Sequence, residues 1–158
     1  MSGDDDRVEV RIDAEGWRAV EPAALAQRCF AAVERAERDV KWPVSLVFTD
    51  DNAVRRLNAQ FRGRDSATNV LSFPPGDAVV AEHDYLGDIA LAFETCEREA
   101  AAKNIALADH AAHLIVHGVL HLIGYDHEDD DEAEEMERRE SEILVTLGVA
   151  DPYGPEAE

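Results

Sequence analysis

Residues 109–123 constrain the fold more than any other part of the sequence. Their aliphatic side chains recur with the period of an α-helix and cover one side of it. Four histidines fall within about 80° of one another on the other side: His110, His113, His117 and His121. A row of four is hard to explain by core packing, because each buried imidazole needs partners for two ring nitrogens. We predict a helix over these residues, with Gly124 as its stop signal.

Three histidines in this region have the spacing of a metal site, in the pattern H-x-x-x-H-x-x-G-x-x-H. His117 and His121 are one helical turn apart, about 6 Å along the axis, so both imidazoles can reach one ion. The chain turns after Gly124, and His127 can return as a third ligand. Three protein ligands leave a fourth position open for water, as in catalytic zinc sites. We therefore expect one zinc ion per chain, since imidazole suits zinc and zinc suits hydrolytic chemistry.

The other polar residues near this pattern have alternative roles. His110 and His113 can line a cleft or support the ligands, but polar filling of a groove is an equal alternative. Asp126 is a candidate for orienting a ligand histidine from behind. His83 lies in a polar segment, and we assign it no role.

The rest of the sequence alternates between strand and helix patterns. Strands are predicted at residues 8–12, 44–48, 69–73 and 88–93, and helices at 21–40, from 50 or 51 to 61, at 94–103 and at 133–147. This alternation predicts an α/β or α+β fold, with a small mixed sheet of about four strands and about five helices packed on it. We expect a single domain over residues 1–158, with loose ends at 1–6 and 152–158.

Charge is distributed unevenly along the chain. The net charge is −20, and residues 126–142 hold eleven acidic side chains against two arginines. Such a balance argues against loose binding to nucleic acid, which depends on basic contacts with phosphates. Four arginines nevertheless cluster within ten residues: Arg55, Arg56, Arg62 and Arg64. One local basic site for a nucleic-acid substrate therefore stays possible.

The cysteines and the N-terminus bear on the cellular compartment. Cys29 and Cys96 lie far apart and form no CxxC pair, so we expect two reduced, at least partly buried thiols. The acidic N-terminus lacks the features of a secretory signal. No apolar run approaches the ~18 residues of a membrane span. We expect a soluble, cytoplasmic protein without a membrane partner.

The histidine spacing is also that of the metzincin proteases, H-E-x-x-H-x-x-G-x-x-H. In those enzymes a glutamate follows the first histidine and acts as general base. Gly118 occupies that position in this chain. The ligand pattern is therefore present without the base of peptide hydrolysis, and a metzincin-like peptidase would need a base from elsewhere.

Four segments together resemble one family, the YbeY family of bacterial endoribonucleases. They are HGVLHLIGYDH with its acidic continuation, FRGRDSATNVLSFP at residues 61–74, LGDIAL at 86–91, and EAEEMERRESEIL followed by LGVADPY. The resemblance covers roughly residues 44–153, and the metal motif shows no departure from the family pattern.

The resemblance implies a metal-dependent ribonuclease that acts on single-stranded RNA, in maturation of the 3′ end of small-subunit ribosomal RNA and in ribosome quality control. It implies metal ligands at His117, His121 and His127, and a functional arginine at Arg62. Expected partners are RNA, the small ribosomal subunit and its assembly proteins, and no DNA. A zinc-stabilised ribosome-assembly factor without catalysis is the non-enzyme alternative.

The residues themselves support a role for Arg62. It precedes Gly63, where the helix over residues 51–61 is expected to end, so its side chain can reach into a cleft. A guanidinium can bind a phosphate through two parallel hydrogen bonds and stabilise charge on its oxygens. In this hypothesis Arg62 positions the phosphodiester and zinc supplies an activated water. No general base is evident, and attack by water or by the RNA 2′-hydroxyl stays open.

Overall fold

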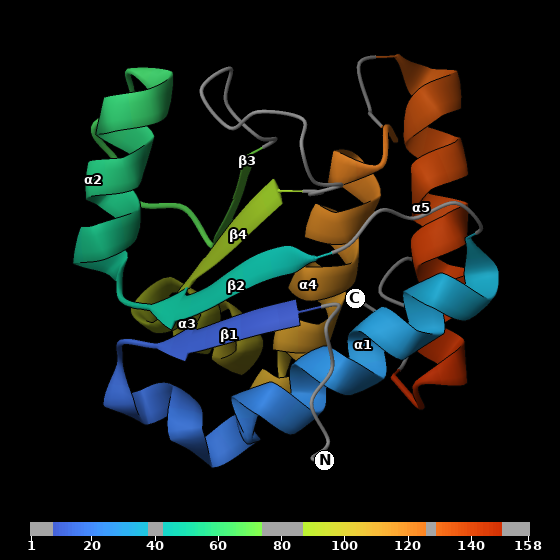
Figure 1. The fold of residues 1–158 in the computed structure, drawn as a ribbon, viewed down its shortest axis with the longest axis horizontal. Coiled ribbons are helices and arrows are strands. Elements are labelled where there is room, and N and C mark those ends of the chain that lie inside the picture. The colour runs from blue at the N-terminus through green and yellow to red at the C-terminus, as the bar shows by residue number, and fades with distance from the viewer. Residues whose placement is uncertain (1–7, 38–42, 74–86, 126–128, 150–158) are drawn as a thin grey trace.

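In the residues that the structure describes, four strands form one mixed sheet in the order β1-β2-β4-β3 (Figure 1). The computed structural model describes residues 8–37, 43–73, 87–125 and 129–149. Strands β1 (Val8–Ile12), β2 (Val44–Thr49) and β4 (Gly87–Ala92) run parallel, and β3 (Val70–Phe73) pairs antiparallel with β4. The antiparallel strand occupies one edge of the sheet.

The register separates the side chains of the sheet into two faces. Leu46 of β2 lies opposite Ile89 of β4, and Val47 lies opposite Ala90. Because neighbouring residues of a strand point to opposite faces, Leu46 and Ile89 face the main core, while Ala90 belongs to a smaller cluster on the other side.

Helices cover the two faces unequally (Figure 1). Helices α1 (Pro22–Ala36) and α4 (Leu107–Leu122) pack on the main-core face, and α5 (Asp130–Thr146) packs against both of them. Helix α2 (Asp51–Arg62) stands on the opposite face, and α3 (Phe93–Lys103) contacts β4, α2 and α4. Helix α4 is the central element: its Ile115, Val116 and Val119 are fully buried, and each such side chain stabilises the fold by about 1.5–3 kcal/mol.

Helices α2 and α3 are joined at their first turns. Asp50 caps α2, its carboxylate accepting a hydrogen bond from the Ala53 amide at 2.8 Å. Asp51 instead accepts from the backbone amide of Thr95 at 3.0 Å and from its hydroxyl at 2.9 Å. The Asp51 amide donates in turn to Glu94 at 2.8 Å. These bonds satisfy backbone donors that a helix start leaves unpaired, and they fix α2 beside the sheet.

The predicted fold class is confirmed: a mixed four-stranded sheet packed with helices. Several boundaries differ. The first long helix ends at Ala36 rather than 40, because Glu37 is extended. Phe93 begins α3 instead of ending β4, and α4 and α5 each start earlier than expected, at Leu107 and Asp130. The ends expected to be loose, 1–6 and 152–158, lie outside the described residues.

One helix had no counterpart in the prediction, the 3-10 helix η1 (Glu15–Val20). It is held by Trp17, which is fully buried and donates its indole N–H to the Thr49 carbonyl at 2.8 Å. The Trp17 ring meets Phe48 and Phe93 edge-on at centroid distances of 5.2 and 5.4 Å. Tertiary contacts, rather than a periodic pattern, therefore define this helix.

Both cysteines are free and buried, as predicted. Burial raises the pKa of each thiol to about 12, so neither is a nucleophile at neutral pH. Among the described helices, none is by itself long and apolar enough to cross a membrane; α3 and α4 reach that length and hydropathy only as a pair bent by 115°.

Candidate functional site

The histidines of α4 form the row that the sequence predicts. The rings of His117 and His121 lie 4.6 Å apart between centroids and nearly perpendicular, at 83°. His113 and His117 are 6.3 Å apart, as are His110 and His113. The two predicted ligands on the helix are therefore the closest pair of the row.

Glu140 of α5 joins two of these histidines. One of its carboxylate oxygens accepts a hydrogen bond from Nδ1 of His117, and the other lies 3.2 Å from Nε2 of His113. The Glu140 side chain has no solvent exposure, and a buried carboxylate is costly unless hydrogen bonds satisfy it. A histidine whose Nδ1–H is held by a carboxylate binds a metal through Nε2. The donor set around His117 thus fits a metal ligand.

Glu140 was missed in the sequence, although a signal was present. Met136, Ile143 and Leu144 form the buried stripe of α5, and Glu140 lies within that stripe at helical spacing. A glutamate in the apolar stripe of an amphipathic helix needs a buried partner. That partner could not be identified without knowing which helix α5 packs on.

The turn after α4 is fixed by hydrogen bonds. Gly124 adopts φ 116°, a conformation that L side chains rarely take, and its amide donates to the His121 carbonyl at 3.1 Å. The Tyr125 hydroxyl donates to Glu37 at 2.8 Å, and Glu37 also pairs with Arg139 of α5 at 2.7 Å. The chain that continues toward His127 therefore leaves from an anchored point between α1 and α5.

Two of the predicted site residues, Asp126 and His127, lie outside the described residues. Over the ranges that are described, no three side chains of His, Cys, Asp or Glu form a group that could hold a metal ion. Of the predicted ligand set, His117 and His121 are therefore described and lie next to each other, and His127 remains the predicted third ligand. His113 lies behind His117, sharing the Glu140 carboxylate with it.

Gly118 has a structural reason to lack a side chain. A Cβ atom at this position would lie 3.1 Å from Cδ1 of Ile89 in β4, closer than ordinary van der Waals contact. Position 118 therefore faces the sheet and not the histidine row. A glutamate placed there would enter the core, so this helix cannot present the metzincin general base as those proteases do.

His110 is buried between α3 and α4. Its Nε2 lies 2.8 Å from the Glu99 carboxylate, which also accepts a hydrogen bond from the side-chain amide of Asn69 at 2.9 Å. Burial lowers the pKa of His110 and outweighs the opposing effect of Glu99. Burial raises the pKa of Glu99, but the hydrogen bonds of His110 and Asn69 hold it below its usual value. The pair is therefore a neutral histidine that donates to a charged carboxylate, and it links α3, α4 and the start of β3.

Arg62 lies at the C-terminal end of α2, on the far side of the sheet from α4 (Figure 1). Its Nη2 donates to the Ser72 carbonyl at 2.6 Å, and its guanidinium carbon lies 5.5 Å from the Phe73 ring centroid. Among the described residues, the Arg62 guanidinium thus contacts β3 and not the histidines.

Arg62 and the histidine row nevertheless approach the same end of the sheet. A Cβ atom on Gly87 would lie 2.4 Å from the Phe73 carbonyl oxygen and 2.8 Å from a methyl group of Leu122. The Arg62 guanidinium lies over the Phe73 ring, and Leu122 follows His121 in the chain. The start of β4 at Gly87 therefore lies beside both the backbone of Phe73 and the end of α4.

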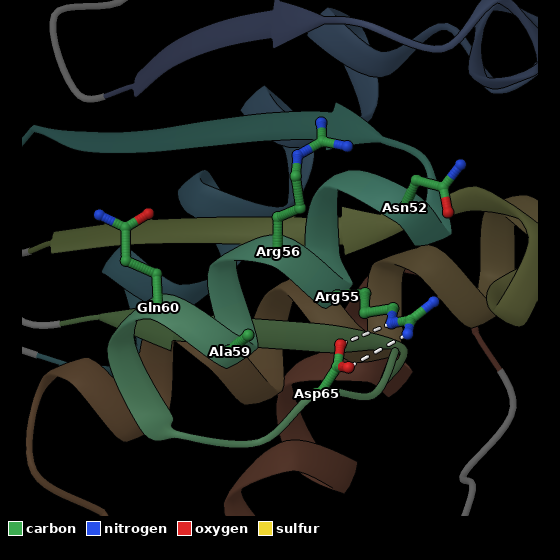
Figure 2. A pocket seen from close by; sticks show the side chains of 6 residues that line it. All are labelled: Asn52, Arg55, Arg56, Ala59, Gln60 and Asp65. Carbon is green, nitrogen blue, oxygen red and sulfur yellow. Dashed lines mark hydrogen bonds and ion pairs between the residues drawn. The ribbon is translucent and has the colours of Figure 1, made fainter.

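The remaining arginines of α2 differ in how they are paired. Arg55 donates two hydrogen bonds to Asp65, at 2.6 and 3.1 Å, which Figure 2 shows as dashed lines. The Arg56 side chain points away from that pair. Within the described ranges, no carboxylate forms an ion pair with Arg56, Arg62 or Arg64. The pairing of Arg55 leaves the other three as the main sources of positive charge at this surface.

Comparison with known proteins assigns the family. The family model described as Endoribonuclease YbeY matches residues 10–148. The chain belongs to the YbeY family. It is 47% identical over 157 residues to Endoribonuclease YbeY of Agrobacterium fabrum, covering 92% of this chain and 94% of the relative. The Jannaschia protein of the same name is 45% identical over 161 residues, covering 92% and 99%.

A solved structure also resembles the YbeY fold seen here. The solution structure of TM1509 from Thermotoga maritima superposes with a TM-score of 0.55 at 25% identity, over 95% of this chain and 96% of the other. The family resemblance and the fold class expected from the sequence are both confirmed.

Proposed function

We propose that this chain is a zinc-dependent endoribonuclease that cleaves single-stranded RNA. The family assignment supports RNA cleavage, since the relatives carry the name endoribonuclease. The observation that supports a metal is the pairing of the buried Glu140 carboxylate with Nδ1 of the part-buried His117, next to His121. The proposed ligands are His117, His121 and His127.

The protein groups have separate proposed roles. A zinc ion bound by the three histidines would polarise a phosphodiester and lower the pKa of a coordinated water to about 7. Glu140 holds the His117 ring in one orientation. Arg62 binds a non-bridging phosphate oxygen, for which it would exchange its bond to the Ser72 carbonyl. Asp126 remains a candidate for orienting a histidine, and the attacking group is either water or the RNA 2′-hydroxyl.

We further propose ribosomal RNA as the substrate, in maturation of the small-subunit 3′ end and in ribosome quality control, with the cytoplasm as the expected compartment. A net charge of −20 weakens unaided binding to RNA. The small ribosomal subunit or one of its assembly proteins would deliver the RNA to the local arginines.

An RNA-cleavage assay on the purified full chain tests this proposal. End-labelled single-stranded RNA is incubated with chelator-treated protein before and after zinc is restored, for the unaltered chain, His121→Ala and the control Asp109→Ala in the first turn of α4. We expect cleavage only with zinc, loss of both zinc and cleavage in His121→Ala, and neither loss in Asp109→Ala.

The other outcomes identify the alternatives. Stoichiometric zinc without RNA cleavage would favour a zinc-stabilised assembly factor, and cleavage of peptides instead of RNA would favour a metzincin-like enzyme. Full cleavage by metal-free protein would refute the metal dependence. The 3′ ends of the products decide the attacking group, because attack by the 2′-hydroxyl leaves a cyclic phosphate.

A further inference from the structure

A groove lies between α2 and the face of the sheet that is turned away from α4. Its volume is about 750 Å³, within the range of about 300–1,000 Å³ that is typical of ligand sites. Val47 and Ala90 line it from the sheet, and Leu57 and Phe61 from α2. Arg62 lines it too, so the groove adjoins the arginine that we propose to bind phosphate.

An aromatic side chain on the groove is exposed to solvent. Phe61 is 61% exposed, whereas most large apolar side chains in the described residues are buried. Its ring lies against Phe73 at a centroid distance of 5.4 Å and a tilt of 56°. Phe73 also lies beneath the Arg62 guanidinium. Phe61, Phe73 and the Arg62 guanidinium therefore lie in one continuous row, and most of the Phe61 residue remains open to solvent.

The charge around the groove favours an anionic partner with an aromatic part. Residues 51–65 hold four arginines and two aspartates, a balance of +2 in a chain of net charge −20. Inside the groove, Asp88 would repel a phosphate, although its carboxylate can accept a hydrogen bond from a base N–H. Phosphate is thus favoured at the arginine rim, and a neutral ring is favoured within the groove.

We propose that this groove binds an unpaired nucleotide of single-stranded RNA, with its base stacked on Phe61 and its phosphate at Arg62; this assignment rests on the proposed ribonuclease function. Sites for single strands combine a basic track with aromatic side chains that stack on bases. A base in a duplex has both faces covered by its neighbours, so the groove selects unpaired RNA. Phe61 is then a binding residue that determines specificity for single strands.

Equilibrium binding to metal-free full-length protein tests the groove apart from catalysis. The probe is a fluorescent single-stranded RNA of about ten nucleotides, with the same strand annealed to its complement for comparison. We expect Phe61→Ala to weaken single-strand binding about five- to a hundred-fold. Phe61→Trp should retain binding, and its added tryptophan fluorescence should be quenched by the RNA. Phe61→Leu, which is apolar but cannot stack, should behave like Phe61→Ala.

Val145→Ala is the matched control, because Val145 is also 61% exposed but lies on α5. It should bind RNA like the unaltered chain. Equal binding by Phe61→Ala and the unaltered chain would overturn the groove assignment and leave the surface to a protein partner. Equal affinity for single-stranded and double-stranded RNA, or no binding of RNA at all, would also overturn the groove assignment. Binding as expected without cleavage on zinc addition would instead contradict the ribonuclease proposal alone.

Discussion

Glu140 and His117 are 23 residues apart in sequence and form a part-buried pair between α5 and α4. Because the carboxylate accepts from Nδ1, the ring can rotate little, and Nε2 is the nitrogen suited to a metal. The same carboxylate contacts His113. The metal affinity of this site should therefore depend on a residue that does not itself bind the metal.

Glu140→Gln should weaken zinc binding about 10- to 100-fold, because an amide is a poorer acceptor for the His117 N–H. The readout is a competition titration against a chromophoric chelator, with circular dichroism to confirm the fold. Glu137→Gln, at an exposed position of the same helix, should leave the affinity unchanged. Equal zinc affinity in both variants would show that Glu140 serves packing and not the metal site.

Gly118→Glu should destabilise the protein by more than about 3 kcal/mol, since it places an unpaired charge and extra volume against Ile89. Urea denaturation measures the loss, and Gly118→Ala should cost less because it adds only one methyl group without a charge. The variant should gain no peptidase activity. A stable Gly118→Glu protein that cleaves peptides would mean that position 118 can face the histidine row.

The histidine row and its stop signal could be predicted because they are local: helical period and a glycine define them within sixteen residues. Glu140, the partner of His117, could not be predicted, since this pairing depends on how α5 packs on α4. The hypothesis that Arg62 and zinc act on one phosphodiester requires Arg62 to reach the same cleft as the histidines, but strand order decides on which face α2 lies. That order depends on long-range pairing, which periodicity does not encode. The helix at Glu15–Val20 was missed for the same reason, because Trp17 is fixed by Phe48 and Phe93.

Stability should fall as the pH falls below about 6.5, the ordinary histidine value. His110 has a lowered pKa in the folded chain, so the unfolded chain binds the proton first and the free energy of unfolding decreases with falling pH. The charged groups facing it are Glu99 and Lys103 of α3, with His113 on its own helix. Glu99 also has a lowered pKa, but its contribution to the free energy of unfolding is lost only below about pH 4.3.

Urea denaturation at about pH 7.5 and about pH 5.5 tests this sign. His110→Gln removes the titrating group while keeping a donor for Glu99, so its loss of stability between the two pH values should be smaller. Lys103→Gln, which leaves His110 in place, should retain most of the loss. An unchanged pH dependence in His110→Gln would show that other groups cause it.

Arg62→Glu should lower kcat/KM for RNA cleavage at least about 100-fold, the effect of removing one charge-stabilising donor, while zinc content stays the same. The reason is geometric: Arg62 lines the groove, and Phe73 beneath its guanidinium lies beside Gly87, where Leu122 of α4 also packs. Arg28→Glu makes the same charge change at an exposed position of α1, on the opposite side of the sheet, and should retain most of the activity. Arg62→Lys should fall between the two, since an ammonium keeps the charge but loses the paired hydrogen bonds. Similar losses in Arg62→Glu and Arg28→Glu would indicate a general effect of net charge, and Arg62 would then have no specific part in cleavage.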